Sequence, residues 1–178
     1  ILAEWATQLL LCRHEPAPCM ECIDCRNCAA HQHPDVFTLH PTGDSRQIRV
    51  EDTRAFLADL VLTSHGGGHR IGIVTPADAL NPNAANALLK TLEEPPPKVA
   101  FIMATTELHK VPDTILSRCQ EFEFRTIATA KIFERLNLIA EAEGVKVTAE
   151  ALREIARSGE GSMRDAQSNF DQVISFSD

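Results

Sequence analysis

The sequence has 178 residues, a formal net charge of −8 and 44% hydrophobic residues. This length and composition fit a globular protein with one main domain and room for a small second one. Phosphate binding depends on clustered basic residues, so the acidic balance argues against a stand-alone nucleic-acid binder. No apolar run approaches the ~18 residues of a membrane span, and the first residues lack the pattern of a signal peptide.

The start of the sequence is rich in leucine and alanine and predicts a helix over residues 1–12. Leu2, Trp5, Leu9 and Cys12 recur at helical spacing, and we expect their face of the helix to be buried. The sequence opens on Ile1, without a methionine and inside this helix. We therefore expect the chain to be N-terminally truncated.

Five of the six cysteines lie close together, at Cys12, Cys19, Cys22, Cys25 and Cys28. Thiolates two residues apart can hold a zinc ion in a tight turn, and a structural zinc site uses four ligands. The clustering favours a metal site in a reducing compartment over a disulfide framework. Four successive ligands at this spacing strain a single site, so Cys12 with three of the others makes a more relaxed set.

Other interpretations of the cysteines stay open. They can be free or paired in disulfides, and CxxCxxC runs also bind iron–sulfur clusters. His14, His31 and His33 are possible substitute ligands, although each alone is more typical of a surface histidine. Four sulfur ligands leave no position for water, so the pattern does not indicate catalytic zinc.

Three short apolar runs alternate with helical segments and predict a parallel sheet. The runs lie at residues 36–39, 70–74 and 99–104. An amphipathic helix is expected over 48–60. A second helix should begin at Pro82 with Asn81 as its cap, and Pro95 should end it.

The carboxyl ends of parallel strands are where nucleotide chemistry usually occurs. A magnesium-dependent ATPase needs one acidic residue there to hold the metal ion and another to orient water. The strand at 70–74 is followed instead by Thr75 and Pro76, which can do neither. The next acid, Asp78, is expected in a turn.

After the third strand, the sequence predicts a short helix over 114–119, an edge strand over 121–124 and then helices only. Three apolar stripes with helical spacing predict a small three-helix bundle. Ser162 is expected to cap the third helix. Arg164 falls in the first turn of that helix, where the helix dipole disfavours a cation, and this conflict suggests a functional role.

Several segments, in order along the chain, resemble the bacterial DNA polymerase III clamp-loader subunits of the AAA+ class. They are the cysteine cluster and residues 86–95 (NALLKTLEEP), 104–106 (ATT), 115–119 (ILSRC) and 161–165 (GSMRD). The resemblance implies an α/β, AAA+ (P-loop NTPase-like) parallel sheet flanked by helices over residues 1–125. It also implies a zinc knuckle inserted at about 12–28 and a three-helix lid domain over 126–178.

The resemblance also implies roles for single residues. The implied zinc ligands are Cys12, Cys19, Cys22 and Cys25, with Cys28 as an alternative. Thr106 resembles the residue that senses the terminal phosphate of ATP, and Arg164 resembles a second sensor in the lid. Arg118 resembles the arginine finger, which acts on ATP held by the neighbouring subunit and is worth ~10³ to 10⁵ in rate in related systems.

The sequence combines features of two subunit types. Gamma and tau subunits carry an Asp-Glu pair where this sequence has Thr75 and Pro76, whereas residues 76–81 and 33–35 resemble delta-prime, which does not hydrolyse ATP. Residues 105–167 resemble gamma and tau. The phosphate-binding P-loop is expected before Ile1, outside this sequence.

The leading hypothesis is a delta-prime-like, non-hydrolysing clamp-loader subunit that supplies Arg118 to a neighbouring ATPase subunit. The implied partners are the other subunits of a cytoplasmic hetero-pentamer, the sliding clamp and, through the complex, primer-template DNA, with no membrane. A structural Zn²⁺ ion is implied, whereas ATP binding stays open. A gamma/tau-type ATPase is the alternative, and a free-standing zinc-knuckle nucleic-acid binder is a weaker one.

Overall fold

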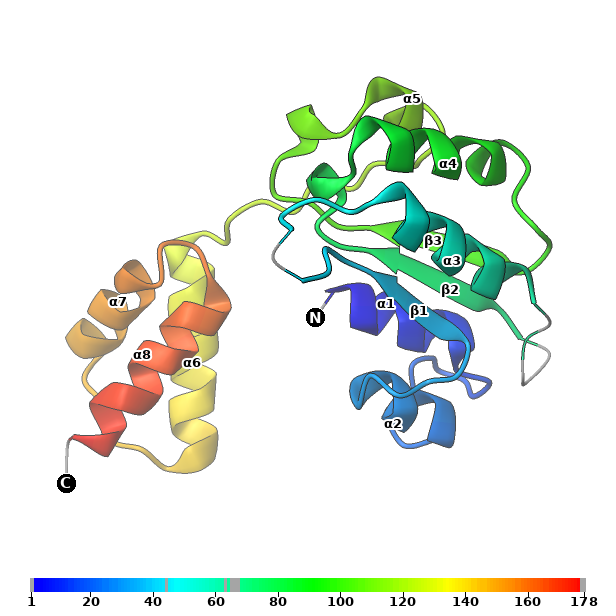
Figure 1. Cartoon of the computed structure of the whole chain (residues 1–178). Helices are drawn as coiled ribbons and strands as arrows, with labels where there is room; N and C mark the ends of the chain where they lie inside the picture. Colours follow the sequence, from blue (N-terminus) through cyan, green and yellow to red (C-terminus); the bar gives the residue numbers. More distant parts are fainter. Residues whose placement is uncertain (1, 44, 63, 65–67, 177–178) are drawn as a thin grey trace. The chain divides into compact units, whose positions relative to one another are not determined.

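The structure is a computed structural model that describes residues 2–43, 45–62, 64 and 68–176. The chain divides into two compact units, Ile1–Glu121 and Phe122–Asp178. The first unit contains a sheet flanked by helices, and the second contains helices (Figure 1). No helix among the described residues has the length and apolar character needed to cross a membrane.

The centre of the first unit is a three-stranded parallel sheet with the order β1-β2-β3. Its strands are β1 (Val36–Leu39), β2 (Arg70–Val74) and β3 (Val99–Met103). Val36 lies opposite Ile71, and Arg70 lies opposite Val99. Every residue of the central strand β2 is buried, as expected for a parallel strand covered on both faces. The three predicted strands are confirmed, and β3 ends one residue before the predicted end.

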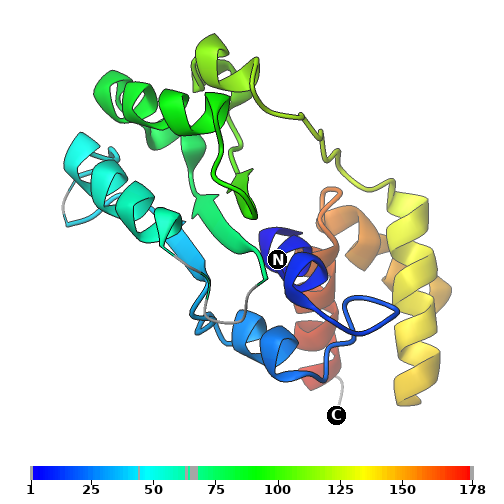
Figure 2. The same ribbon diagram turned by 90° about the vertical axis from the view of Figure 1, so that its right-hand side faces the viewer.

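Helices cover both faces of the sheet (Figures 1 and 2). One face carries α3 (Val50–Val61), α4 (Pro82–Glu93) and α5 (Asp113–Leu116), and the other carries α1 (Leu2–Leu11) and α2 (Ile23–Ala29). Two 3₁₀ turns, Ala77–Ala79 and Leu108–Lys110, follow β2 and β3. Successive strand residues alternate between the faces, so Val74 packs in the α3/α4 core while Ile71 and Ile73 pack against α1 and α2.

The helix ends follow the sequence signals. The side chain of Asn81 accepts a hydrogen bond from the N–H of Ala84, and Pro82 occupies the first turn of α4, as predicted. The helix α3 begins at Val50, two residues later than expected, because Ile48 forms a parallel β-bridge with Leu80 instead. The extended backbone that this bridge requires at Ile48 is incompatible with helix, so α3 can begin only after it.

The predicted helix α1 is present, but Trp5 and Leu9 of its predicted buried face are exposed; the side chain of Leu2 lies outside what the structure describes. Trp5 and Leu9 are 48% and 39% exposed, whereas Thr7, Gln8 and Leu11 are buried. Polar residues can occupy the buried face because they have partners there. The hydroxyl of Thr7 donates to the carbonyl oxygen of Ala3, and Gln8 bonds across to the cysteine cluster.

The edge strand predicted over residues 121–124 is also wrong. Residues 120–128 have no regular secondary structure, and Phe122 and Phe124 are 69% and 70% exposed. Alternating apolar residues form a strand only where a neighbouring strand accepts and donates backbone hydrogen bonds. Among the described residues, no strand pairs with this segment.

The second unit contains the predicted three-helix bundle, made of α6 (Thr129–Glu143), α7 (Ala149–Ser158) and α8 (Met163–Ser175). Its apolar stripes meet in one core, which includes Ile132, Leu136, Leu152, Ala156 and Phe170. The side chain of Ser162 accepts a hydrogen bond from the N–H of Asp165 and caps α8, as predicted. The helix α8 thus begins at a capping residue that the local sequence specifies.

Candidate functional site

Four of the five clustered cysteines converge on one point. The Sγ atoms of Cys12, Cys19, Cys22 and Cys25 all lie within 4.8 Å of one another. Sulfurs bound to one tetrahedral zinc ion at ~2.3 Å are ~3.8 Å apart, so the cluster is close to the size that such an ion needs. All four are free thiols rather than disulfides. They could therefore hold a metal ion.

Short turns of the backbone bring these sulfurs together. Cys12 directly follows α1, and the sulfur of Cys22 caps α2 by accepting the N–H of Cys25 at 3.4 Å. The same contact occurs twice more, from the N–H of Cys19 to the sulfur of Cys12 at 3.4 Å and from Cys22 to Cys19 at 3.3 Å. Amide donors favour the thiolate, which is the form that binds a metal.

The sulfurs differ in their electrostatic surroundings. Backbone N–H donors, mainly that of Cys22, lower the pKa of Cys19 to about 6. Cys25 is fully buried, and desolvation raises its pKa to about 12. A bound cation offsets the cost of a buried thiolate. The donor set therefore fits a metal ion, with Cys19 ready as a thiolate and Cys25 dependent on the cation.

Cys28 lies outside the cluster. Its side chain is 5% exposed and belongs to the apolar cluster that contains Leu11, Ile71 and Ile73. Burial raises the pKa of this thiol to about 11. Cys28 is thus a neutral core residue, and the geometry favours the other four cysteines as ligands.

Side chains around the cluster tie it to the rest of the first unit. Nε2 of Gln8 donates to the backbone oxygen of Cys25 at 3.0 Å. The buried His33 has Nε2 3.3 Å from Asp24 Oδ1, and its Nδ1 accepts the N–H of Asp35 at 3.1 Å. Since both ring nitrogens of His33 are engaged elsewhere, it is not a ligand of this cluster.

The other two candidate histidines also lie outside it. Nε2 of His31 is 3.3 Å from Glu4 Oε1, which links the turn after α2 to α1. The contact between Cys12 and His14 involves the backbone oxygen of His14, 3.7 Å from the Cys12 sulfur, and not the imidazole ring. Within the described residues, the group of possible ligands at this point consists of cysteines.

The carboxyl end of the sheet carries Thr75 and Pro76 directly after β2. Asp78, which follows them, accepts a hydrogen bond from the hydroxyl of Thr105 at 2.5 Å. Thr105 lies two residues beyond β3, and its oxygen also accepts the N–H of Glu107 at 2.9 Å. The Asp78 carboxylate thus joins the ends of β2 and β3.

Arg118 lies two residues beyond α5, with its guanidinium held by its own unit. Nε donates to Glu93 Oε1 at 3.1 Å, and one Nη donates to the same oxygen. The other Nη donates to the backbone oxygen of Thr114 at 2.6 Å and to the hydroxyl of Ser117 at 3.2 Å. The Arg118 side chain is still 32% exposed, so it reaches the surface.

The two residues expected to sense nucleotide belong to different units. Thr106 is exposed in a bend after β3, in the first unit. Arg164 is exposed in the first turn of α8, in the second unit. The Arg164 side chain has no hydrogen bond or ion pair with any residue that the structure describes.

The sequence patterns did not reveal three of these contacts. Glu93 lies within the motif at 86–95 but is 25 residues from Arg118. Asp78 and Thr105 are 27 residues apart, and Gln8 and Cys25 are 17 apart. Helical and strand periodicities reach only a few residues, so pairs this distant follow from the fold.

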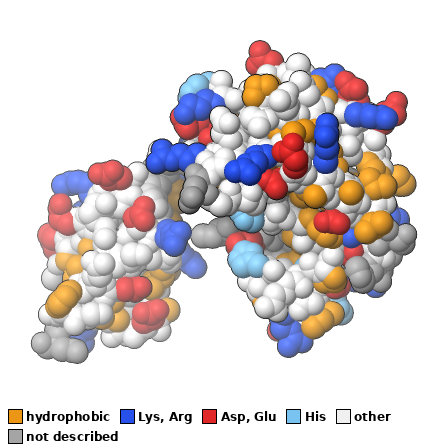
Figure 3. Space-filling model, viewed as in Figure 1, with side chains coloured by type: hydrophobic (Ala, Val, Ile, Leu, Met, Phe, Trp, Pro, Cys, Tyr) orange, Lys and Arg blue, Asp and Glu red, His pale blue; other side chains and the backbone are white. Residues whose placement is uncertain are grey.

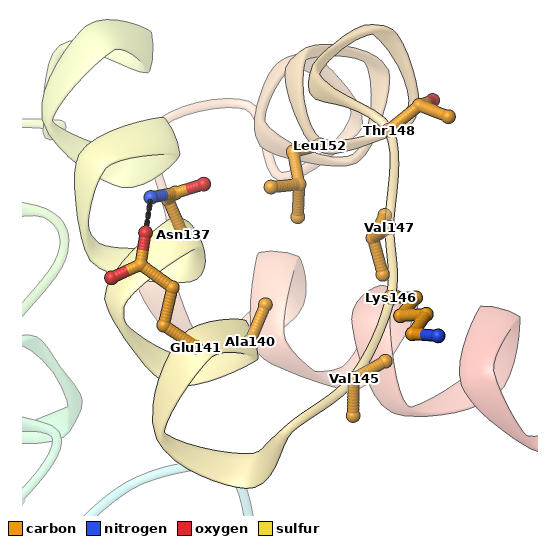
Figure 4. A pocket seen from close by; sticks show the side chains of 8 residues that line it. All are labelled: Asn137, Ala140, Glu141, Val145, Lys146, Val147, Thr148 and Leu152. Atoms are coloured by element: carbon orange, nitrogen blue, oxygen red, sulfur yellow. Dashed lines mark hydrogen bonds between the residues drawn. The ribbon is translucent and has the colours of Figure 1, made fainter.

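A groove of about 480 Å³ is present on the second unit, between α6 and α7 (Figure 4). The side chains of Ala140, Val145, Val147 and Leu152 line it, and Asn137 donates to Glu141 at its edge at 2.6 Å. None of the residues proposed from the sequence lines it. The groove therefore adds nothing to the candidate sites.

Comparison with known families matches both units. Residues 1–128 match the family model described as DNA polymerase III, delta subunit. Residues 131–178 match the model described as DNA polymerase III clamp loader subunit, ATPase lid domain. The chain therefore belongs to the family of bacterial DNA polymerase III clamp-loader subunits.

Individual relatives are also subunits of DNA polymerase III. The DNA polymerase III subunit tau of Bacillus subtilis (strain 168) is 40% identical over 170 residues, or 93% of this chain and 29% of the relative. That of Escherichia coli (strain K12) is 36% identical over 161 residues, or 90% and 25%. The subunit gamma of Buchnera aphidicola subsp. Baizongia pistaciae is 34% identical, over 90% and 43%. The chain thus spans less than half of each relative.

A solved structure supports the fold. The DNA polymerase III gamma subunit-related protein of Thermotoga maritima MSB8 superposes with a TM-score of 0.51. The match has 23% sequence identity and covers 76% of this chain and 49% of that one. At this level of identity the similarity concerns the architecture of the chain.

Proposed function

We propose that this chain is part of a delta-prime-like clamp-loader subunit that does not hydrolyse ATP and that presents Arg118 to ATP on a neighbouring subunit. The observation that carries the proposal is Thr75 and Pro76 at the end of β2. An ATPase of this kind needs carboxylates there to hold magnesium and to orient water. The nearby Asp78 is already bonded to Thr105.

The assembled complex would be a cytoplasmic hetero-pentamer that places the sliding clamp on primer-template DNA. DNA would be contacted through the whole complex, because this chain has a net charge of −8. Acidic and basic side chains are interspersed on the face shown in Figure 3, without one continuous basic stripe. Such a surface supports a subunit that joins other subunits more than a free-standing nucleic-acid binder.

A structural zinc ion at the sulfur cluster is part of the proposal. The cluster dimensions and the three N–H to sulfur contacts support thiolate ligands. The ligands would be Cys12, Cys19, Cys22 and Cys25. A zinc ion there would have a structural role and cross-link the chain, since four sulfur ligands leave no position for a reacting water.

Substitution of Arg118 tests the finger role. The complete loader, reconstituted with full-length subunits, should lose DNA-stimulated ATP hydrolysis when Arg118→Ala is introduced, by a factor of ~10³ or more if this finger resembles those known. The control is Arg125→Ala, because Arg125 is 81% exposed and pairs with the neighbouring Glu123. Unchanged hydrolysis in the Arg118 variant contradicts the proposal.

A gamma/tau-type ATPase is the second candidate, because the relatives that align with this chain carry those names. In that case Thr106 and Arg164 would contact ATP bound to the subunit itself. The full-length subunit, purified alone with Thr75 and Pro76 intact, distinguishes the two. ATP hydrolysis by that protein would favour this candidate over the first.

A further inference from the structure

The contacts of Arg118 fix its guanidinium from two sides. Glu93 Oε1 accepts from Nε and from one Nη, which form one edge of the guanidinium. The backbone oxygen of Thr114 and the hydroxyl of Ser117 accept from the other Nη. Arginine has five N–H donors, and these contacts use four of them. Among the residues that the structure describes, one N–H of the Nη that faces Glu93 has no acceptor and is left for another partner.

The two anchors differ in rigidity. Thr114 and Ser117 belong to α5 and its end, a helix of only four residues. Glu93 is the last residue of α4, a helix of 12 residues whose Ala84, Ala85 and Leu88 are buried in the main core. A short turn alone holds a long side chain loosely, whereas a packed helix supplies a fixed reference point.

We propose that Glu93 is a positioning residue that holds Arg118 ready for the terminal phosphate of a nucleoside triphosphate on the neighbouring subunit. The inference rests on the finger role proposed for Arg118. Arginine has several rotatable bonds, and a guanidinium already fixed in its plane loses less freedom when it meets a phosphate. Its remaining N–H and its 32% exposed surface leave it accessible to that partner.

The geometry predicts an effect on turnover more than on substrate binding. Glu93 does not touch the nucleotide in this scheme, so its loss leaves the neighbour's nucleotide pocket unchanged. It does free the guanidinium to sample positions away from the phosphate. Misplacement of a catalytic group by ~1 Å can cost ~10²-fold in rate. A side chain still held by Thr114 and Ser117 should lose less than that.

The adjacent residue supplies a matched control. Glu94 is exposed and caps the end of α4 through its backbone N–H, which donates to the oxygen of Lys90. Its side chain is not a partner of Arg118, whose carboxylate contact is Glu93. Glu93→Gln and Glu94→Gln remove the same charge from neighbouring positions. A difference between them therefore reports on the contact with Arg118.

The test uses the complete clamp loader, reconstituted with each full-length variant, and follows DNA-stimulated ATP hydrolysis. Glu93→Gln should lower kcat about tenfold with KM unchanged, within the range open to a misplaced group. Glu94→Gln should match the wild type. The double variant Glu93→Gln, Arg118→Ala should be no slower than Arg118→Ala alone, because the two residues act through one contact.

Each other result overturns the inference. Wild-type turnover of the Glu93→Gln loader would show that Glu93 does not position Arg118. Faster turnover would show that Glu93 holds Arg118 away from the phosphate. A double variant slower than Arg118→Ala points to an independent role of Glu93. If Arg118→Ala itself leaves hydrolysis unchanged, both the finger role of Arg118 and the positioning role of Glu93 fail. If only Glu93→Gln leaves it unchanged, the positioning role alone fails.

A measurement on the wild-type protein covers the case in which Glu93→Gln does not fold. The Nε–H of Arg118, assigned by its absence in Arg118→Lys, should exchange slowly with water in the NMR spectrum of the wild type. Glu94→Gln should leave this signal in place, and a folded Glu93→Gln should lose its protection. Fast exchange in the wild type would overturn the inference.

Discussion

Gln8 and Cys25 are joined by a hydrogen bond from the side-chain Nε2 of Gln8 to the backbone oxygen of Cys25, 3.0 Å long. Gln8 is 7% exposed and lies on α1, whereas Cys25 lies in α2 and is fully buried. The bond therefore connects the first helix to the interior side of the sulfur cluster.

Loss of this bond should destabilise the first unit. Gln8→Ala removes this buried hydrogen bond to the Cys25 oxygen, so we expect the free energy of unfolding to fall by about 0.5–1.5 kcal/mol. Urea denaturation followed by circular dichroism measures the change. Gln32→Ala is the control, because Gln32 is exposed and should have little effect. Equal stabilities of the two variants would show that the bond contributes nothing.

The choice of ligands predicts different effects for two buried cysteines. Elemental analysis of the purified chain should find one zinc ion per molecule. Cys25→Ser should lose most of this zinc, whereas Cys28→Ser should keep it, because Cys28 packs among apolar residues outside the sulfur cluster. Removal of the metal by a chelator should lower the Tm. Iron in place of zinc, or equal loss from both variants, contradicts the assignment.

The buried thiol of Cys28 predicts a pH dependence. Burial raises its pKa from 9.0 to about 11. In the unfolded chain the thiol ionises at lower pH, so its contribution to stability is complete below pH ~9 and is lost as the pH rises toward ~11. The difference in unfolding free energy between the zinc-loaded wild type and Cys28→Ala should therefore shrink as the pH rises from ~9 toward ~11. A constant difference would mean that Cys28 does not titrate on unfolding.

Gly72 is needed for the contact between β2 and α3. A Cβ atom at this position would lie 2.7 Å from a ring carbon of Phe56 and 2.8 Å from a methyl carbon of Leu60. Gly72→Ala should lower the unfolding free energy by about 1–3 kcal/mol through overpacking. Gly68→Ala is the control, since its Cβ would meet nothing within 4 Å. The urea midpoints of the two variants provide the comparison.

Arg164 predicts opposite effects on stability and on function. The helix dipole disfavours a cation in the first turn of α8, so Arg164→Ala should raise the unfolding free energy of the second unit by about 0.3–1 kcal/mol. If Arg164 contacts nucleotide, the same change should weaken the response of the complete loader to ATP. Arg135→Ala, in the middle of α6, should do neither. A variant that is less stable and fully active would contradict both expectations.

Local patterns in the sequence were sufficient for most of the elements. The apolar runs at 36–39 and 70–74 formed strands, and Asn81 and Ser162 capped the helices that they were expected to begin. These signals act within a few residues, so the rest of the fold does not alter them. The convergence of Cys19, Cys22 and Cys25 was also predictable, because only two residues separate each successive pair in the sequence.

Other features depended on neighbours that a local pattern does not contain. Phe122 and Phe124 alternate like strand residues but have no partner strand among the described residues. The helical spacing of Trp5 and Leu9 was apparent, yet Gln8 became buried because it reaches the oxygen of Cys25. The pairing of Glu93 with Arg118 likewise requires that α4 and α5 lie side by side.

Cys28 packs against Ile71 and Ile73, so the segment that contains the cysteines forms part of the hydrophobic core of the first unit. A chain shortened by removal of residues 13–28 would leave apolar side chains of the central strand open to water. Such exposed surface promotes aggregation. A related subunit without residues 13–28 would need polar substitutions on β2, or another helix to cover that face of the sheet. Deletion of the segment alone should therefore give insoluble protein.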